Sequence, residues 1–450
     1  MYVVQIISRV LLLFLTLNTF VVKANNQLTP IEQKLRTAVE KALPNAVKEL
    51  QQAININSGT MNFSGVRKVG ELYDSQLTDI GFQTEWIDGA EFNRAGHLVA
   101  VHESKHANAP KVLLIGHLDT VFAEHDEFQQ WQLLDEHSLQ GPGVNDMKGG
   151  NTIIVTAMRV LKEVGLLSQM NIAIVMTGDE ESSGRPLSKS KAAIVEYAKW
   201  ADIALGFESG DSDINTAMAG RRGYVGWTLE ITAKSAHSSR LFTDNVGYGA
   251  IYESARILSQ FREQLSQFQD LTYNPGMIIG GTRISHDTST YTGEAFGKSN
   301  VIASSAKVTG DIRATSGQQF AQAKQHMERI VAAAPKHIES NITFSDGYPP
   351  MAVTKGNTEL LALYSQVSAD LGYNKVLPAN PRNAGAADIS FAAAYVDMAI
   401  DGIGMMGSGA HTKDEVGDLK SFHKNIEKAA ILLHRLTTTG WLIVDQNLVE

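Results

Sequence analysis

Some short stretches of this chain are apolar at every position and end in charged or small polar residues. The clearest is Val112-Leu113-Leu114-Ile115, and the segment at residues 171–176 contains a second one, which begins after Asn171. A strand without a polar face must be buried on both sides, which is typical of a largely parallel sheet. Helical patterns, such as that at residues 149–164, alternate with these strands. The alternation predicts an α/β fold with a three-layer domain.

The order of the elements changes after Glu208. Residues 223–232 alternate like a half-exposed strand, and a helix, two strands, a helix and a final strand at 342–344 follow. This β-α-β-β-α-β order predicts a small two-layer α+β domain inserted into the larger one. A chain of 450 residues is also long enough for two cores. We predict a catalytic domain of residues 25–217 and 348–450, with an inserted lid or dimerisation domain of residues 218–347.

The first 24 residues differ from the rest. Arg9 precedes an almost unbroken apolar run over residues 10–22, and Val22-Lys23-Ala24 offers a cleavage point. The pattern predicts a cleaved secretory signal peptide at residues 1–24, and hence a periplasmic or secreted protein. The alternative is an uncleaved membrane anchor, but the run is shorter than the roughly 20 residues that a spanning helix needs.

Charge and cysteine content narrow the function. Signal cleavage removes two basic residues and no acid, so the formal net charge changes from −9 to −11. An acidic protein of this kind does not support a nucleic-acid partner. The chain has no cysteine, so disulfides and thiolate metal ligands are excluded. Any metal must be bound by His, Asp and Glu.

A histidine and an aspartate follow the first buried apolar run. In Gly116-His117-Leu118-Asp119-Thr120, the strand period of two puts His117 and Asp119 on the same side, so the carboxylate can support the imidazole. Open α/β sheets place their functional sites at such strand ends. Alone, the pair is better explained as a satisfied polar contact at a strand end.

Other possible metal ligands occur at predicted strand ends or in glycine-rich loops, namely Asp146, Glu181, Glu208 and His411. Asp146 lies among four glycines just before a helix, and Glu181 ends the acidic run Asp179-Glu180-Glu181. Successive acids repel one another, and their ionised forms are costly to bury without a counter-charge. Taken singly, these residues have simpler explanations, such as an N-capping aspartate or a solvated acidic turn.

Together the candidates form the ligand set of a two-metal site. Two histidines and three carboxylates suffice for two zinc ions if one carboxylate bridges them. Two Zn²⁺ carry four positive charges, which three carboxylates and one hydroxide balance. We therefore predict two zinc ions per subunit, bound by His117, Asp146, Glu181, Glu208 and His411.

These motifs resemble the zinc-dependent exopeptidase and deacylase family of glutamate carboxypeptidases, aminoacylases and succinyl-diaminopimelate desuccinylases. The resemblance extends from about Gln33 to Leu436. The motifs that carry it are His117-Leu118-Asp119, Asp146-Met147-Lys148-Gly149-Gly150, Asp179-Glu180-Glu181 and His411.

The resemblance implies a role for each site residue. Asp146 would bridge both zinc ions; His117 and Glu208 would complete one ion's ligands, and Glu181 and His411 those of the other. Glu180 would stay free of metal and act as general base. Asp119 would orient His117, and the Asp146-Met147 peptide would be cis.

Three motifs of the inserted domain also match the family: Ala236-His237-Ser238, Asn300-Val301-Ile302 and Asp311-Ile312-Arg313. The resemblance implies that His237 polarises the scissile carbonyl, often from the partner subunit of a homodimer. Asn300 and Arg313 would bind the free carboxylate of the substrate, since a guanidinium meets a carboxylate through two hydrogen bonds. A surface ion pair between Arg313 and Asp311 is the alternative.

Two departures from the family pattern concern the substrate pocket. Ala303 replaces the usual proline after Asn-Val-Ile, and residues 282–299 form a longer segment than usual. Neither change affects the predicted metal ligands. Both leave the side-chain preference of the pocket open.

The implied activity is hydrolysis of the amide bond to a C-terminal amino acid of a small peptide or N-acyl amino acid, by a hydroxide that bridges two zinc ions. Glu208, where some relatives have Asp, favours the glutamate carboxypeptidase branch, with glutamate as a candidate for the released residue. An N-acyl amino acid deacylase is the alternative with the same chemistry. A non-catalytic zinc-binding protein is the alternative of another class, and the presence of Glu180 argues against it. No membrane partner is expected after signal cleavage.

Overall fold

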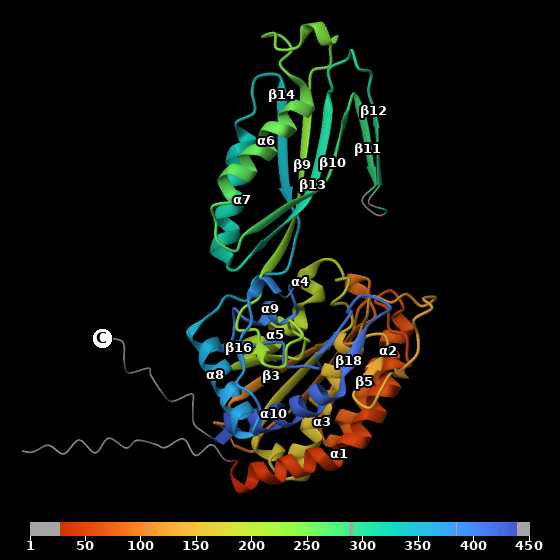
Figure 1. Cartoon of the computed structure of the whole chain (residues 1–450), viewed down its shortest axis with the longest axis vertical. Helices are drawn as coiled ribbons and strands as arrows, with labels where there is room; N and C mark the ends of the chain where they lie inside the picture. The colour runs from red at the N-terminus through yellow and green to blue at the C-terminus, as the bar shows by residue number, and fades with distance from the viewer. Residues whose placement is uncertain (1–27, 107, 288–289, 291, 384, 439–450) are drawn as a thin grey trace, which may run out of the picture.

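The computed structural model describes residues 28–106, 108–287, 290, 292–383 and 385–438. These form a larger domain at the bottom of Figure 1 and an elongated smaller domain above it, joined by two connections. The predicted signal peptide lies outside the described residues. Among the described helices, none is both long and apolar enough to cross a membrane.

The larger domain is built on a six-stranded sheet with the order β1-β2-β6-β3-β7-β16. Its inner strands β6, β3 and β7 are parallel, as is β16, whereas β2 runs antiparallel to both of its neighbours. The strands are β1 (Gln83–Asp88), β2 (Gly96–His102), β3 (Lys111–His117), β6 (Asn171–Thr177), β7 (Ile203–Gly206) and β16 (Met398–Ile400).

Strand β3 buries both of its faces. Val112 and Leu114 belong to one hydrophobic core, and Leu113 and Ile115 belong to another on the opposite side of the sheet. The first core is completed by α1 (Pro30–Ile54), α2 (Phe63–Ile80), α3 (Gly149–Glu163), α8 (Lys355–Asp370) and α10 (Leu419–Thr438); the second by α5 (Ala192–Trp200) and α9 (Ile389–Ala392). The predicted three-layer α/β domain is thus confirmed.

The first helix contains a proline, Pro44, in its interior. Helix α1 continues through Pro44 without a break. Proline removes one backbone donor, but Pro44 is exposed, so water can satisfy the carbonyl that is left free.

Smaller strands bring distant loops to the edge of the main sheet. A four-stranded sheet has the order β17-β18-β5-β4, so that residues near 140 pair with residues near 416. The short strands are β4 (Gln132–Leu133), β5 (Ser138–Gln140), β17 (Gly407–Ser408) and β18 (Val416–Asp418), with a separate pair, β8 (Thr216–Ala217) and β15 (Leu377–Pro378).

The smaller domain is a four-stranded antiparallel sheet with the order β10-β13-β9-β14, covered on one face by two helices (Figure 1). Val225, Trp227 and Leu229 of β9 alternate toward these helices. The elements are β9 (Gly223–Ala233), α6 (Gly249–Leu265), β10 (Thr272–Gly281), β13 (Ser305–Ala314), α7 (Gly317–Ala332) and β14 (Ile338–Phe344). Their order is the predicted β-α-β-β-α-β.

An additional hairpin explains the long segment at residues 282–299. Its strands are β11 (Arg283–Asp287) and β12 (Thr292–Phe296), which pair antiparallel beyond the end of β10. Most of its residues are exposed. The extra length therefore extends the smaller domain and leaves its four-stranded core unchanged.

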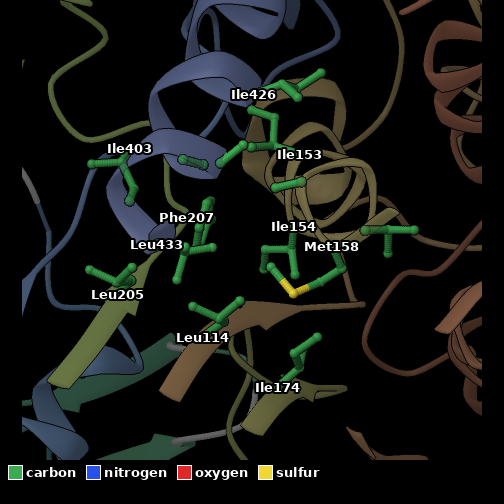
Figure 2. Close-up of a cluster of buried hydrophobic side chains, with 14 of the residues drawn as sticks. Leu114, Ile153, Ile154, Met158, Ile174, Leu205, Phe207, Ile403, Ile426 and Leu433 are labelled. Carbon is green, nitrogen blue, oxygen red and sulfur yellow. The ribbon is translucent and has the colours of Figure 1, made fainter. Parts of the chain in front are cut away.

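The core beside α3 provides a stability prediction. Leu114 and Ile174 face Ile154 and Met158 of this helix (Figure 2), and Leu114 is fully buried. Leu114→Ala should lower the free energy of unfolding of the larger domain by about 2–5 kcal/mol, because the cavity cannot fully collapse. Val353→Ala is the control, since Val353 is 61% exposed. This substitution should change the free energy of unfolding by about 0.5 kcal/mol or less. Urea unfolding measures both, and equal effects would contradict the packing described.

Candidate metal centre

The predicted ligands meet at the C-terminal edge of the main sheet. His117 is the last residue of β3, Glu181 follows β6 and Glu208 follows β7. Asp146 lies in the segment Val144–Lys148, directly before α3, and its own backbone is non-helical, with φ of −132° and ψ of 85°. His411 comes from the loop between β17 and β18 and has a left-handed backbone with φ of 65°. Parallel strands end at the same edge, so residues remote in sequence become neighbours.

The five side chains form two groups that share Asp146. In the first group, Nε2 of His117 lies 3.1 Å from Oδ1 of Asp146 and 3.4 Å from Oε1 of Glu208. In the second, Nε2 of His411 lies 3.1 Å from Oδ2 of Asp146 and 3.1 Å from Oε2 of Glu181. Within each group the candidate ligand atoms lie within 4.8 Å of one another. Asp146 thus presents one oxygen to each group.

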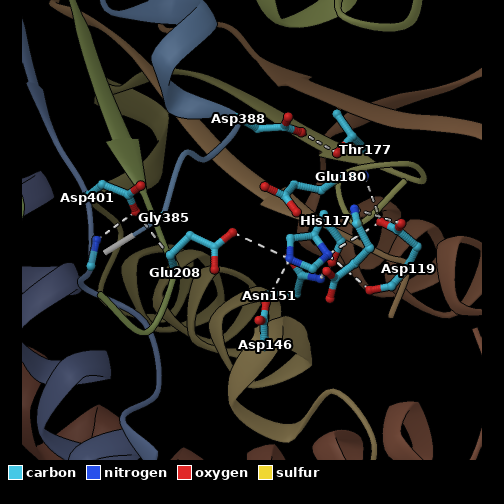
Figure 3. A network of polar contacts seen from close by, with 12 residues as sticks. His117, Asp119, Asp146, Asn151, Thr177, Glu180, Glu208, Gly385, Asp388 and Asp401 are labelled. Atoms are coloured by element: carbon cyan, nitrogen blue, oxygen red, sulfur yellow. Dashed lines mark hydrogen bonds and ion pairs between the residues drawn. The ribbon is translucent and has the colours of Figure 1, made fainter. Parts of the chain in front are cut away.

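Among the described residues, Glu180 belongs to neither ligand group. Its side chain points into the space near His117, Glu208 and Asp388 (Figure 3). Burial raises the pKa of Glu180 well above its usual range, and Glu208, Asp388 and Glu181 raise it further. The two adjacent acids Glu180 and Glu181 therefore have different surroundings.

The remaining acids also depend on a counter-charge. Burial raises the pKa of Glu181 to about 7, and burial together with Asp146 raises the pKa of Glu208. Burial also acts on Asp146, but its contacts with the two histidines hold its pKa below the usual range. In the absence of any cation, Asp146 and Glu181 raise the pKa of His411 to about 11. The site thus concentrates carboxylates that only positive charge can stabilise.

Buried carboxylates hold the backbone of this site in place. Both oxygens of Asp119 accept backbone N–H groups, from Glu180 at 3.0 Å and from Glu181 at 3.1 Å. Nδ1 of His117 lies 3.0 Å from the backbone carbonyl of Asp119 and 3.4 Å from its carboxylate. Asp119 therefore contacts His117 mainly through its backbone, and its carboxylate positions the acidic loop.

Two further buried acids have the same function and were not found from the sequence. Glu415 accepts the backbone N–H groups of Gly143, Asn145 and Asp146 at 2.9, 3.0 and 3.3 Å. Burial raises the pKa of Glu415 to about 8. No motif marks this residue, because its partners are backbone groups about 270 positions away.

Asp401 holds the backbone of Glu208 in place in the same way. Its Oδ1 accepts the backbone N–H of Glu208 at 3.3 Å (Figure 3). Its Oδ2 accepts the Nε–H of Arg221 at 2.7 Å. Both side chains of this ion pair are buried. Gly150 also contributes, because a Cβ there would lie 2.0 Å from the carbonyl oxygen of Phe207. Gly150 thus allows α3 to begin directly against the chain that carries Glu208.

The donor set fits two divalent cations. Each group offers one imidazole nitrogen and carboxylate oxygens, the ligands that Zn²⁺ takes when thiolates are absent. Asp146 can donate to both groups at once, and the expected cis peptide Asp146-Met147 is present. Two cations would also supply the charge that the buried acids require.

The residues predicted to bind substrate are not all near this centre. His237 and Asn300 are neighbours, since the backbone N–H of Ser238 donates to the carbonyl of Asn300 at 2.9 Å. They lie where β9 ends and before β13 begins. Arg313 lies at the other end of β13, opposite Tyr224 and close to the connections between the domains. Strand geometry puts roughly 30 Å between the two ends of β13.

Arg313 also forms the ion pair that was its alternative explanation. Its Nε lies 3.0 Å from Oδ2 of Asp311, and its guanidinium lies 5.4 Å from the centre of the Tyr224 ring. The side chain remains about one third exposed. One edge of the guanidinium is thus engaged within the domain.

A cavity lies beside the second ligand group. It has a volume of 440 Å³, and Glu181 and Ser182 contribute to its wall. Opposite them lie Met61 and Val121, which are 63% and 41% exposed. The candidate metal centre is therefore accessible from a cleft with polar and apolar walls.

Comparisons with known proteins agree with this geometry. The model of peptidase family M20/M25/M40 matches residues 113–436. Carboxypeptidase G2 of Pseudomonas sp. (strain RS-16) is 24% identical over 396 residues, which are 87% of this chain and 89% of that protein. A probable succinyl-diaminopimelate desuccinylase of Staphylococcus epidermidis is 31% identical over 137 residues, which are 30% of this chain and 33% of that protein.

Solved structures share the fold. The crystal structure of aminopeptidase PepT from Bacillus cereus superposes with a TM-score of 0.68 at 16% identity and covers 88% of this chain and 98% of that one. The family match extends over more than half of the sequence and includes every strand that carries a candidate ligand. The chain belongs to peptidase family M20/M25/M40 and is a hydrolytic enzyme.

Proposed function

We propose that this enzyme is a di-zinc metallocarboxypeptidase that hydrolyses the amide bond to a C-terminal amino acid of a small peptide or N-acyl amino acid. The proposal rests on the two carboxylate oxygens of Asp146, one of which faces each ligand group, while Glu180 belongs to neither group. The similarity to carboxypeptidase G2 over 87% of the chain supports this substrate class. Glutamate is our candidate for the released residue.

The protein's own residues account for the steps of the reaction. Bound zinc would supply a Lewis acid that polarises the scissile carbonyl and makes water a better nucleophile at neutral pH. Glu180 would accept the proton of the attacking water and later donate it to the leaving nitrogen. Its position is held by Asp119, which accepts its backbone N–H at 3.0 Å.

We further propose that the substrate site is completed by a second subunit. Arg313 would bind the substrate carboxylate from the same chain, and His237 and Asn300 would come from the partner, because they lie at the far end of the smaller domain. A homodimer through this domain would cover its exposed apolar side chains. These are Phe242, Ile251, Tyr252, Ile278 and Phe296, each more than half exposed.

We also propose that the enzyme is exported to the periplasm or secreted, on the basis of the sequence of residues 1–24. N-acyl amino acid deacylation is the second candidate function. The similarity to a desuccinylase over the segment of 137 residues favours it. Both activities use the same residues on different acyl groups.

A substrate panel separates these functions. The zinc-loaded enzyme should hydrolyse dipeptides and N-acyl derivatives that end in a free carboxylate, with C-terminal glutamate preferred. The matched C-terminal amides should be poor substrates, because Arg313 loses its bidentate partner. A chelator should abolish turnover and added zinc should restore it. Faster release of succinyl or acetyl groups than of any amino-acyl group would favour the deacylase, and no turnover at all would contradict the proposal.

Substitution of the base tests the division between the adjacent acids. Glu180→Gln should retain two zinc ions per subunit and lose about 10²–10⁴-fold in kcat, because only the proton transfer is removed. Glu181→Gln is the matched control and should lose bound metal. Metal content by mass spectrometry and steady-state kinetics check both. Loss of zinc from Glu180→Gln would show that base and ligand are misassigned.

Mixed dimers test the contribution of the second subunit. His237→Ala and Glu180→Gln should each be inactive as homodimers. After unfolding and refolding together in equal amounts, about a quarter of the wild-type activity should return, because half of the dimers are mixed and each mixed dimer has one intact site. A mixture that stays inactive although dimers form would mean that His237 does not act across the interface.

A further inference from the structure

A buried ionic cluster lies beneath the acidic loop that carries Glu180. Lys191 places its Nζ 2.9 Å from Oδ1 of Asp179 and 3.0 Å from Oδ1 of Asp388. All three side chains are at most 3% exposed. Oδ2 of Asp388 accepts the hydroxyl of Thr177, the last residue of β6, at 2.5 Å. The proposed reaction uses none of these groups.

The cluster has two acids and one lysine, so it needs further donors. Ser190 donates its hydroxyl to Oδ2 of Asp179 at 2.6 Å, and the backbone N–H of Gly184 does so at 2.8 Å. Oδ1 of Asp388 also lies 3.2 Å from the hydroxyl of Tyr348, whose single proton is shared between this carboxylate and the backbone carbonyl of Glu180. A buried acceptor that loses such a donor is costly, so Tyr348 is part of what keeps Asp388 in place.

Tyr348 also contacts the acidic loop directly. Its hydroxyl lies 3.2 Å from the backbone carbonyl of Glu180 and 2.8 Å from the hydroxyl of Ser183. The ring packs edge-on against Phe391, with ring centres 4.8 Å apart. The Tyr348 side chain therefore contacts the loop of the proposed base at a carbonyl and a hydroxyl, whereas Asp119 contacts its backbone N–H groups.

The backbone of Tyr348 belongs to the connection between the two domains. Its carbonyl accepts the N–H of Tyr224 at 2.9 Å, at the start of β9. Tyr224 in turn is opposite Arg313 in the sheet of the smaller domain. One residue thus joins that sheet through its backbone and the acidic loop through its side chain.

The connection between the two domains also borders a cavity. A cavity of 920 Å³ lies between it and α5, and Asp346 and Gly347 contribute to the wall. Arg185 donates to the carbonyl of Asp346 at 3.2 Å across this region. Packing alone does not fix the connection there, which increases the importance of the Tyr348 hydroxyl.

We propose that Tyr348 is a positioning residue that couples the orientation of the smaller domain to the position of Glu180. When the smaller domain moves over a substrate, the connection moves with it, and the Tyr348 hydroxyl transmits that movement to the carbonyl of Glu180. The proposal rests on the assignment of Glu180 as general base. Tyr348 itself would bind neither substrate nor metal.

Removal of the hydroxyl tests the proposal. Tyr348→Phe should lower kcat about 10–100-fold, as is usual for residues that orient reacting groups, with KM within about twofold and both metals retained. Tyr364→Phe is the matched control, because Tyr364 is also buried and donates to Asn425 at 3.3 Å within the larger domain. The control should keep the wild-type kcat. Kinetics and metal content are measured on the full-length enzyme.

A second variant keeps the test decisive if Tyr348→Phe does not fold. Asp388→Asn should give the same selective loss of kcat, and the double variant should be little worse than either single one, because both act on one network. Unchanged kcat in Tyr348→Phe overturns the proposal, as does a loss of metal or a rise in KM alone. If only Asp388→Asn folds, an unchanged kcat in that variant also overturns the proposal.

The failure of the proposed function would look different. An inactive wild-type enzyme, or a fully active Glu180→Gln variant, contradicts the role of the base itself. Wild-type activity that depends on Glu180, combined with an unchanged kcat in Tyr348→Phe, contradicts only the coupling.

Discussion

The hydrogen bonds from backbone amides to three buried carboxylates are the interaction on which the rest of the site depends. Asp119, Glu415 and Asp401 accept the N–H groups of Glu180, Asp146 and Glu208, and none of the three acids is exposed. Where such an acid is ionised, these bonds are about twice as strong as neutral ones. They fix the loops that present the acidic ligands, so that acids which repel one another are held close together before any cation binds.

The position of these loops follows from the burial of the central strands. Strand β3 has no polar face, so helices must cover both sides, and the edge where β3, β6 and β7 end is the place left for polar side chains. Carboxylates gathered there are costly without positive charge. The same burial that stabilises the domain therefore makes the edge a candidate cation site, and it raises the pKa of Glu180, the proposed base.

The residues of the proposed reaction come from both domains. The larger domain contains every candidate metal ligand, whereas His237 and Asn300 lie at the far end of the smaller domain, beyond a strand of ten residues. Contact between these parts needs a second subunit or a large movement. Tyr348 belongs to the connection that any such movement must pass through, and it touches the loop of the proposed base. Domain orientation and chemistry are thus linked by one side chain.

The sequence by itself determined the layers, the order of elements in both domains and the five candidate ligands, because these depend on hydrophobic periodicity and on residue types at strand ends. It also separated Glu180 from Glu181, by resemblance. The resemblance likewise implied that Asp146 is shared by both ligand groups. Only the tertiary structure decided that Glu415 and Asp401 hold the ligand loops, and that Asn300 and Arg313 lie apart. These features depend on backbone groups and on contacts between residues up to about 270 positions apart, and such contacts leave no local pattern in the sequence.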